Sequence, residues 1–149
     1  MAKICVQSQD FNMANESQLI RQGRQDIGAI VSFIGLVRDF NDKSLKSMTL
    51  EHYPAMTKLE LERIADEAKK RWPLQDLTII HRHGELFPGD QIVLVITASA
   101  HRSAAFQAAS YVMDFLKTRA PFWKKEKTED TNQWVEAKHS DETATKDWS

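Results

Sequence analysis

The stretch HRSAAFQAASYVMDFLKTRAPFWKKEK, residues 101–127, decides how this chain folds. It begins with an apolar, helix-forming run over residues 103–118, which is followed by a proline break and a short aromatic and basic segment. Cations stand at both ends of the helix, with His101 and Arg102 before it and Lys117 in its last turn. The 149-residue chain has a formal net charge of only −1, so this positive charge is local. Cations around an apolar helix are what a pocket for an anionic ligand requires.

Apolar periodicity on either side predicts strands and helices in mixed order. We expect strands at residues 3–6 (an edge strand), 28–37, 47–53, 77–83, 91–98, 122–125 and 133–137. We expect further helices at residues 15–22, capped by Asn15 or Ser17, and from a Thr57–Glu60 capping box to Trp72, where Pro73 stops the helix. The run GAIVSFIGLV (28–37) is nearly all apolar, which is typical of a buried central strand. Helices and strands do not alternate strictly, which favours an α+β fold.

Length and composition predict one domain over residues 1–149, with a polar, loosely held tail at about 139–149. Residues 38–47 are expected to form a mobile loop, and the Gly- and Pro-rich residues 84–90 a hairpin turn. Near-zero net charge argues against a general nucleic-acid binder or a membrane-surface protein. We see neither a membrane-length apolar run nor a signal peptide, so we expect a cytoplasmic protein.

Two lysines flank the proline break, Lys117 at the helix end and Lys124 just after Phe122 and Trp123. Taken alone, the first is explained by the helix dipole, which favours a cation there by about 0.3–1 kcal/mol. The second is explained as a solvated member of a basic run. Pro121 turns the chain between them, so Lys124 can fold back toward the helix end. Two lysines beside aromatic side chains disfavour each other's charge, which suits acid–base or nucleophilic chemistry.

Other cations stand where predicted elements end. His101 and Arg102 lie where a strand passes into a helix, where backbone N–H groups bind anions and arginine adds a planar fork for phosphate or carboxylate. A capping or surface pair explains these two residues equally well. Arg38 ends the most apolar strand, and an ion pair with Asp39 or Asp42 is an equally good explanation for it.

Metal and cysteine chemistry find little support in the sequence. His81 and His83 alternate along a predicted strand and so share a face, but no third ligand accompanies them at suitable spacing. Cys5 is the one cysteine, so an internal disulfide and a zinc cluster of cysteines are excluded. No phosphate-binding loop, dinucleotide fingerprint or hydrolase elbow is present. We therefore expect neither a metal nor a cofactor.

Several segments together resemble the large, catalytic subunit family of molybdopterin synthase. They are TLEHYPAMTKLELERIADEA (49–68), HRHGELFPGDQIVLV (81–95), AHRSAAFQAASYVMDFLKTRAPFWKKE (100–126) and WVEAK (134–138). The likeness runs in order from about Gly28 to Lys138. The motifs LEHYP, HRxGxLxxGD, AHR and LKTRAPFWKKE are jointly specific, although each alone is weak.

The resemblance implies a sulfurtransferase of molybdenum cofactor biosynthesis, which converts cyclic pyranopterin monophosphate (precursor Z) to molybdopterin. It implies that the dithiolene sulfur arrives as a thiocarboxylate on the C-terminal Gly-Gly of a small ubiquitin-like subunit. The implied assembly is a heterotetramer, in which a homodimer of this chain carries one small subunit at each end. The implied fold is α+β, of an α/β-hammerhead type with an additional antiparallel β subdomain.

The resemblance also assigns roles to residues that the charge pattern singles out. Lys117 matches the essential lysine of the family and Lys124 its second lysine. The substrate-binding positions of the family match Leu36, Val37, Arg38, His101, Arg102, Lys117, Lys124, Lys125 and Glu126. Lys138, where relatives often carry arginine, is a candidate contribution from the neighbouring subunit.

These roles lead to one hypothesis for a single pocket. Arg38, His101 and Arg102 would hold the phosphate and pterin, while Lys117 and Lys124 receive the incoming sulfur. No cysteine is well placed to carry sulfur, which fits an external donor. The alternative is a non-catalytic binding module for a phosphorylated metabolite or a peptide carboxylate. A small RNA-binding domain using residues 122–127 is disfavoured by the near-neutral charge, and we expect no nucleic-acid or membrane partner.

Overall fold

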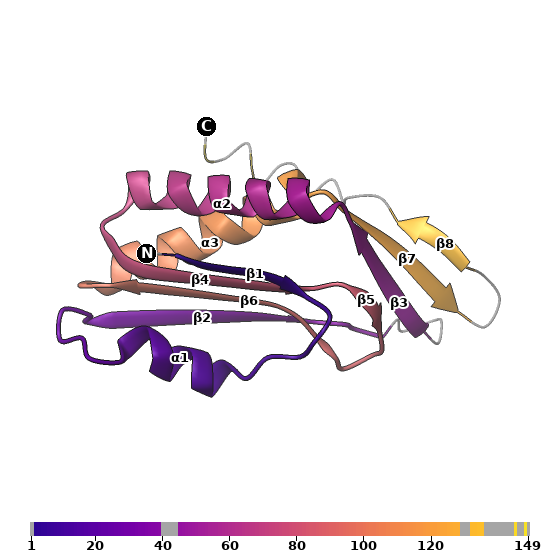
Figure 1. Cartoon of the computed structure of the whole chain (residues 1–149), viewed down its shortest axis with the longest axis horizontal. Coiled ribbons are helices and arrows are strands. Elements are labelled where there is room, and N and C mark those ends of the chain that lie inside the picture. The colour runs from indigo at the N-terminus through magenta and orange to yellow at the C-terminus, as the bar shows by residue number, and fades with distance from the viewer. Residues whose placement is uncertain (1, 40–44, 129–131, 136–144, 146–147, 149) are drawn as a thin grey trace.

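Two four-stranded sheets, which we call sheet A and sheet B, form the framework of the molecule (Figure 1). The computed structural model describes residues 2–39, 45–128, 132–135, 145 and 148. Sheet A has the order β1-β4-β6-β2, from β1 (Lys3–Gln7), β4 (Leu74–Arg82), β6 (Gln91–Ser99) and β2 (Ala29–Leu36). Sheet B has the order β5-β3-β7-β8, from β5 (Gly84–Leu86), β3 (Leu45–His52), β7 (Phe122–Thr128) and β8 (Asn132–Val135). The helices are α1 (Met13–Arg21), α2 (Pro54–Arg71) and α3 (Arg102–Arg119).

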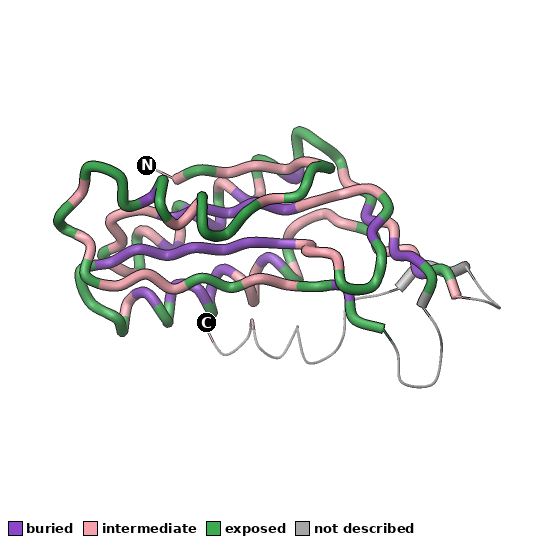
Figure 2. The backbone as a smooth tube through the Cα atoms, turned by 90° about the horizontal axis from the view of Figure 1, so that it is seen from below, coloured by how far each residue is buried: buried purple, intermediate pink, exposed green. Residues whose placement is uncertain are grey.

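The hydrophobic core lies on both faces of sheet A. Its central strands β4 and β6 are antiparallel and form the most continuously buried part of the chain (Figure 2). α2 and α3 cover one face, where Ile64 and Val112 pack with Ile79. α1 covers the other face, where Ile20 packs with Ile80 and Leu94. Each fully buried aliphatic side chain stabilises the fold by about 1.5–3 kcal/mol, so these two layers hold sheet A in place.

The apolar run 28–37 does not form the central strand that its composition predicts. It forms β2, which lies at the edge of sheet A and pairs with β6, while β1 occupies the opposite edge as expected. Phe33 and Leu36 have exposed fractions of 40% and 55%. α3 packs against β2, and Ile30 and Ile34 join the core beneath α1. An edge strand with helices on both faces needs almost as much apolar surface as a central one.

The predicted caps of two helices are wrong. α1 begins after Asn12, whose side-chain oxygen accepts a hydrogen bond from the N–H of Asn15, so neither Asn15 nor Ser17 is the cap. The box predicted at Thr57 does not form either. α2 begins at Pro54, one turn earlier, after Tyr53, whose side chain makes no capping hydrogen bond. Proline suits the first turn because that N–H has no helical partner.

Thr57 has a different use inside the molecule. It is fully buried in α2, and its hydroxyl donates a hydrogen bond to the carbonyl of Pro121, just before β7. The helix ends at Arg71 with Trp72 as its cap, as the following proline predicts. No helix among the described residues is both long enough and apolar enough to cross a membrane.

Sheet B is antiparallel. The chain passes into it from sheet A between β2 and β3 and again between β4 and β5. Residues 84–90, predicted as a simple turn, contain the short strand β5, which pairs with β3 rather than with sheet A. Gly84 has a φ of 92°, which allows the chain to change sheets directly after β4. β3 lies between β5 and β7, and β8 is the far edge. The α+β fold with an additional antiparallel sheet is therefore confirmed.

α3 is held close to sheet A by small side chains. Ala105 and Ala108 are fully buried, and the hydroxyl of Thr97 in β6 donates to the carbonyl of Ala105. The entry to the helix is fixed by Gly28, whose N–H donates to the carbonyl of Ser99. A Cβ at Gly28 would lie 2.1 Å from the carbonyl oxygen of Ala100, so only glycine fits there.

The end of the tail is better anchored than its polar composition predicts. Most of residues 139–149 lie outside the described residues, but Trp148 packs edge-on against Trp72 and Tyr111, with ring centroids 5.6 and 5.5 Å away. Its indole N–H donates to the carboxylate of Asp114, and its carbonyl accepts from Arg71. Trp148 thus packs against residues at the end of α2 and within α3.

We predict that Trp148→Ala lowers the free energy of unfolding by about 2–3 kcal/mol, because aromatic packing and a hydrogen bond are both lost. Trp148→Phe keeps a ring against Trp72 and should lose only about 1 kcal/mol. Denaturant unfolding of both variants beside the wild type measures this difference. Equal midpoints for the alanine variant and the wild type would show that the tail contributes nothing.

Candidate active site

Lys117 lies where α3 leaves sheet A and approaches sheet B. It is exposed in the last turn of the helix, directly after the buried Leu116. Its positive charge reaches the ring of His81 near the end of β4, where it helps to keep that ring neutral. The end of α3 is therefore directed at the junction of the two sheets.

Lys124 reaches the same junction from sheet B. Side chains alternate along a strand, so Lys124 shares one face of β7 with Phe122 and Glu126. Leu50 and Met48, its neighbours on β3 across that face, are buried, which makes this the inner face of sheet B. The ammonium of Lys124 lies 4.0 Å from the carboxylate of Glu126, which is itself mostly buried.

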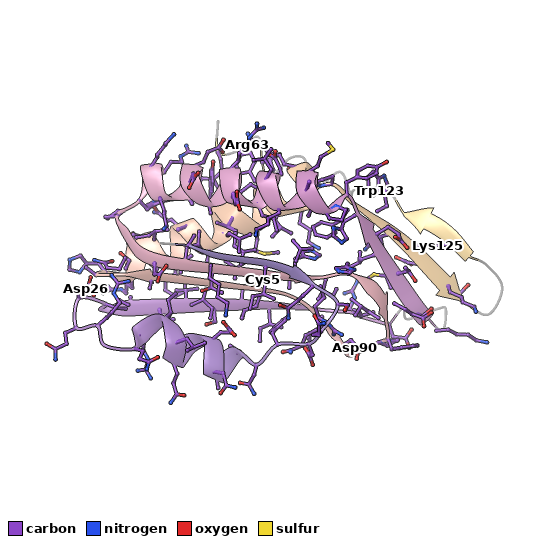
Figure 3. The ribbon with its side chains drawn as sticks, viewed as in Figure 1. Cys5, Asp26, Arg63, Asp90, Trp123 and Lys125 are labelled. Carbon is purple, nitrogen blue, oxygen red and sulfur yellow. The ribbon has the colours of Figure 1, made fainter. Side chains whose placement is uncertain are left out.

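Lys125 points the other way. It pairs with Thr49 in the register of β3 and shares the outer face of β7 with Trp123 (Figure 3). Lys127 belongs to that outer face as well. Strand alternation therefore separates Lys125 from Lys124 and places Glu126 beside Lys124.

A stacked pair of rings connects the two lysines. The rings of His81 and Phe122 are stacked, with centroids 3.8 Å apart and an interplanar angle of 17°. Phe122 precedes Lys124 by two residues on the inner face of β7, and Lys117 lies near the other ring. The two lysines that the sequence singles out therefore lie on either side of this ring pair, Lys117 towards His81 and Lys124 beside Phe122.

Arg38 is held near this junction by the residues before it. Val37 is buried among the side chains of sheet B; its N–H donates to the carbonyl of Asp90, and its carbonyl accepts from the N–H of Gly89. Both backbone groups of Val37 are used, so this residue positions Arg38. Leu36 and Arg38 on either side are exposed.

His101 and Arg102 lie at the opposite end of sheet A. Helix α3 rises about 1.5 Å per residue, so Arg102 and Lys117 are roughly 22 Å apart along it. The β2–β6 register agrees, because Leu36 pairs with Gln91 while Ala29 pairs with Ser99 at the other end. Figure 3 shows Asp26 and Asp90 near these two opposite ends.

One chain therefore does not form the single pocket proposed from the sequence. His101 and Arg102 are exposed at the free N-terminus of α3, where the cap makes no side-chain hydrogen bond. Lys117, Lys124 and Arg38 lie at the other end. Lys138 and residues 40–44 lie outside the described residues.

Comparison with known proteins identifies the family. The family described as MoaE protein matches residues 6–119. The chain is 57% identical to the molybdopterin synthase catalytic subunit of Mesorhizobium japonicum, over 96% of this chain and 91% of that protein, and 52% identical to that of Escherichia coli, over 98% and 97%.

The chain belongs to the molybdopterin synthase catalytic subunit family. The structure of a Burkholderia ambifaria molybdopterin biosynthesis MoaE protein superposes with a TM-score of 0.86 at 48% identity, covering 99% of this chain and 98% of that one. The family and enzyme class expected from the sequence motifs are thereby confirmed.

In this family member, histidines at the sheet junction were not recognised from sequence as parts of the site. His81 and His83 alternate as predicted, but β4 ends between them, and His83 lies against His52 with ring centroids 4.3 Å apart. Among the described residues, no group of three or more His, Cys, Asp or Glu side chains could hold a metal ion. The HRH and LEHYP motifs contain these histidines, but the sequence does not show that His83 and His52 are in contact in the fold.

Burial favours the neutral form of His81 and of His52. It lowers the pKa of His81 to about 4, and the charge of Lys117 acts in the same direction, against a hydrogen bond to the carbonyl of Arg82. Because a carbonyl can only accept, Nδ1 of His81 carries the proton in that 2.7 Å contact. Burial likewise lowers the pKa of His52, and His83 adds to the effect.

We predict an acid-sensitive fold that traces to His81. Its pKa is about 4 in the folded chain and near 6.5 in the unfolded chain, so the unfolded state binds the extra proton first as the pH falls. The contribution of His81 to the free energy of unfolding is present above pH 6.5 and falls by about 3 kcal/mol as the pH decreases to 4.

Denaturant unfolding at pH 7 and pH 4 tests this, with His81→Phe as the matched non-titrating variant. The wild type should lose about 3 kcal/mol more than the variant across this range. Parallel pH dependences in the two proteins would contradict the assignment.

Proposed function

We propose that this chain is the catalytic subunit of a molybdopterin synthase, which inserts dithiolene sulfur into cyclic pyranopterin monophosphate. The observation that carries the proposal is the convergence of Lys117 and Lys124 on one junction, through the stacked rings of His81 and Phe122. These are the two lysines that match the catalytic positions of the family.

The sulfur donor is a partner rather than this chain. Cys5, on β1, packs into the core beneath α1, whereas Lys117 and His81 lie on the α2–α3 side of sheet A. The relatives are named catalytic subunits, which fits an enzyme with a further subunit. We infer a small ubiquitin-like partner whose C-terminal Gly-Gly thiocarboxylate reaches the two lysines.

Each sulfur transfer has two steps in this proposal. The thiocarboxylate sulfur attacks a carbon of the substrate side chain, and the C–S bond forms as the C–O bond at that carbon breaks. The displaced oxygen leaves as a phosphate oxygen at one carbon and as water at the other, while Lys117 stabilises the negative charge that develops on it. Water then cleaves the acyl–sulfur bond, releasing the partner as a carboxylate and leaving the sulfur on the substrate, with Lys124 moving a proton. Glu126, 4.0 Å from Lys124, orients that lysine. Two transfers complete the dithiolene, so the partner is exchanged once.

The pterin and its phosphate need cations that one chain does not bring to the lysines. We infer a composite pocket in a homodimer, with Lys117, Lys124 and Arg38 from one copy and His101 and Arg102 from the other. The exposed N-terminus of α3 supplies backbone N–H groups, and Arg102 supplies a planar fork for the phosphate. The separation of roughly 22 Å along α3 supports this division.

The other residues predicted to bind substrate have different roles, which follow from their positions in the fold. Leu36 is exposed beside Arg38 and can contact the substrate, and Val37 holds that turn in place. Lys125, on the outer face of β7, is better suited to the partner subunit than to the pterin. Lys138 remains a candidate contribution from the neighbouring copy.

We predict that Lys117→Ala reduces dithiolene formation at least 100-fold, because stabilisation of the negative charge that develops on the displaced oxygen is lost. Lys127→Ala, on the outer face of β7, is the matched control and should keep wild-type turnover. The assay mixes purified protein, thiocarboxylated partner and cyclic pyranopterin. A folded Lys117→Ala variant with wild-type turnover would refute the assigned role, and saturable pterin binding without turnover by the wild type would favour a binding module.

We also predict that Arg102→Ala weakens pterin binding about 10- to 100-fold, because a charge-assisted hydrogen bond to phosphate is lost. Affinity for the small partner should change little, because in the composite pocket Arg102 binds the phosphate, whereas the C-terminus of the partner reaches Lys117 and Lys124. Calorimetry with each ligand separates the two effects. Unchanged pterin affinity, or a loss of partner affinity instead, would remove Arg102 from the phosphate site.

A further inference from the structure

A row of four neighbouring rings, of which one pair is stacked, lies at the junction between sheets A and B. The ring of His83 lies 4.3 Å from that of His52, which lies 6.0 Å from Phe122, which in turn stacks on His81 at 3.8 Å. No step of the proposed reaction uses these histidines. Nδ1 of His52 is buried with no hydrogen-bond partner among the described residues, so the ring is placed by packing.

The His81–Phe122 stack joins β7, which carries Lys124, to sheet A, on which the helix that carries Lys117 is packed. His81 belongs to β4 and lies on the face of sheet A that α2 and α3 cover, whereas Phe122 and His52 are paired residues of β7 and β3 in sheet B. The stacked pair is thus a direct side-chain contact between the two sheets. Lys117 is on the helix packed on sheet A, and Lys124 is on β7.

The ring of His81 is fixed in plane as well as in place. Nδ1 donates to the carbonyl of Arg82 at 2.7 Å, which holds the imidazole at a defined angle. Phe122 lies against it nearly parallel, at 17°. Lys124 follows Phe122 by two residues on the same face, so a shift of β7 that carries the phenyl ring also moves the lysine.

We propose that the His81–Phe122 stack is a positioning element that sets the separation of Lys117 and Lys124, and hence the alignment of the sulfur donor with the substrate. This inference rests on the proposed function, since it assumes that the two lysines act together. A small error in the alignment of reacting groups costs much of the rate while leaving ground-state binding nearly intact. The stack should therefore affect kcat rather than KM.

Two substitutions of one residue separate the ring from its hydrogen bond. His81→Phe keeps a planar ring against Phe122 but cannot donate to the carbonyl of Arg82. His81→Gln keeps a donor for that carbonyl but has no ring to stack. Both are assayed in the complex with the thiocarboxylated partner, after circular dichroism and partner binding confirm the fold.

We expect His81→Gln to lower kcat about tenfold with KM for the pterin within about twofold, and His81→Phe to stay within about threefold of the wild type. Wild-type kcat in a folded His81→Gln variant would overturn the inference. So would an equal loss in both variants, or a change confined to KM. If His81→Gln does not fold, Phe122→Leu, which removes the other ring, should reproduce the selective loss of kcat, and wild-type kcat there would overturn the inference.

Lys117→Ala and Lys124→Ala in the same assay distinguish this inference from the function beneath it. Full activity in the lysine variants would refute the proposed function. Inactive lysine variants beside a fully active His81→Gln would leave that function intact and refute only the positioning role.

Discussion

The rigid length of α3 is the constraint on which the site depends. Buried alanines such as Ala105 and Ala108 hold the helix against sheet A, and the hydroxyl of Thr97 donates a hydrogen bond to the carbonyl of Ala105 in its first turn. A helix packed in this way cannot bend to bring its ends together, so Arg102 and Lys117 stay roughly 22 Å apart. The cations of the proposed pocket are therefore divided between two ends of the molecule. In the proposed homodimer, a second copy of the chain would resolve this division, because a two-fold axis can place the helix N-terminus of one copy near the lysines of the other without a change in either fold.

The junction between the two sheets is the second determinant of function. The helix that carries Lys117 is packed on sheet A, and the strand that carries Lys124 is part of sheet B, so the geometry of the lysine pair is a property of the contact between sheets. That contact is made by the rings of His81 from β4 and Phe122 from β7. Burial and the nearby ammonium group of Lys117 both favour the neutral form of the imidazole. The neutral imidazole allows close stacking on Phe122 next to a cation. Burial therefore serves the site as well as the stability of the fold.

Much of the fold could be predicted from the sequence, because apolar periodicity and proline punctuation act locally. The bounds of α3 were predicted to within one residue at each end. The edge position of β2 could not be predicted, because a strand under two helices carries the same apolar pattern as a central one. The short strand β5 was missed because its partner, β3, is distant in sequence.

The site was predicted in part for similar reasons. Charge and motif pointed to Lys117 and Lys124, and the structure places both at one junction. The same charge pattern grouped His101 and Arg102 with these lysines. A pattern of charges along the sequence does not include the roughly 22 Å that the helix between them spans. The stacked rings were missed because His81 and Phe122 are forty-one residues apart in sequence, counted from 81 to 122.

The division of the site between two copies is tested most directly by complementation. Lys117→Ala and Arg102→Ala chains are mixed, reassociated and assayed with the thiocarboxylated partner at limiting pterin, where each variant alone has little activity. A mixed dimer has one site with both residues intact, so random reassociation should recover about one quarter of wild-type activity. Activity no higher than the average of the two variants would show that both residues act within a single chain, and would contradict the composite pocket.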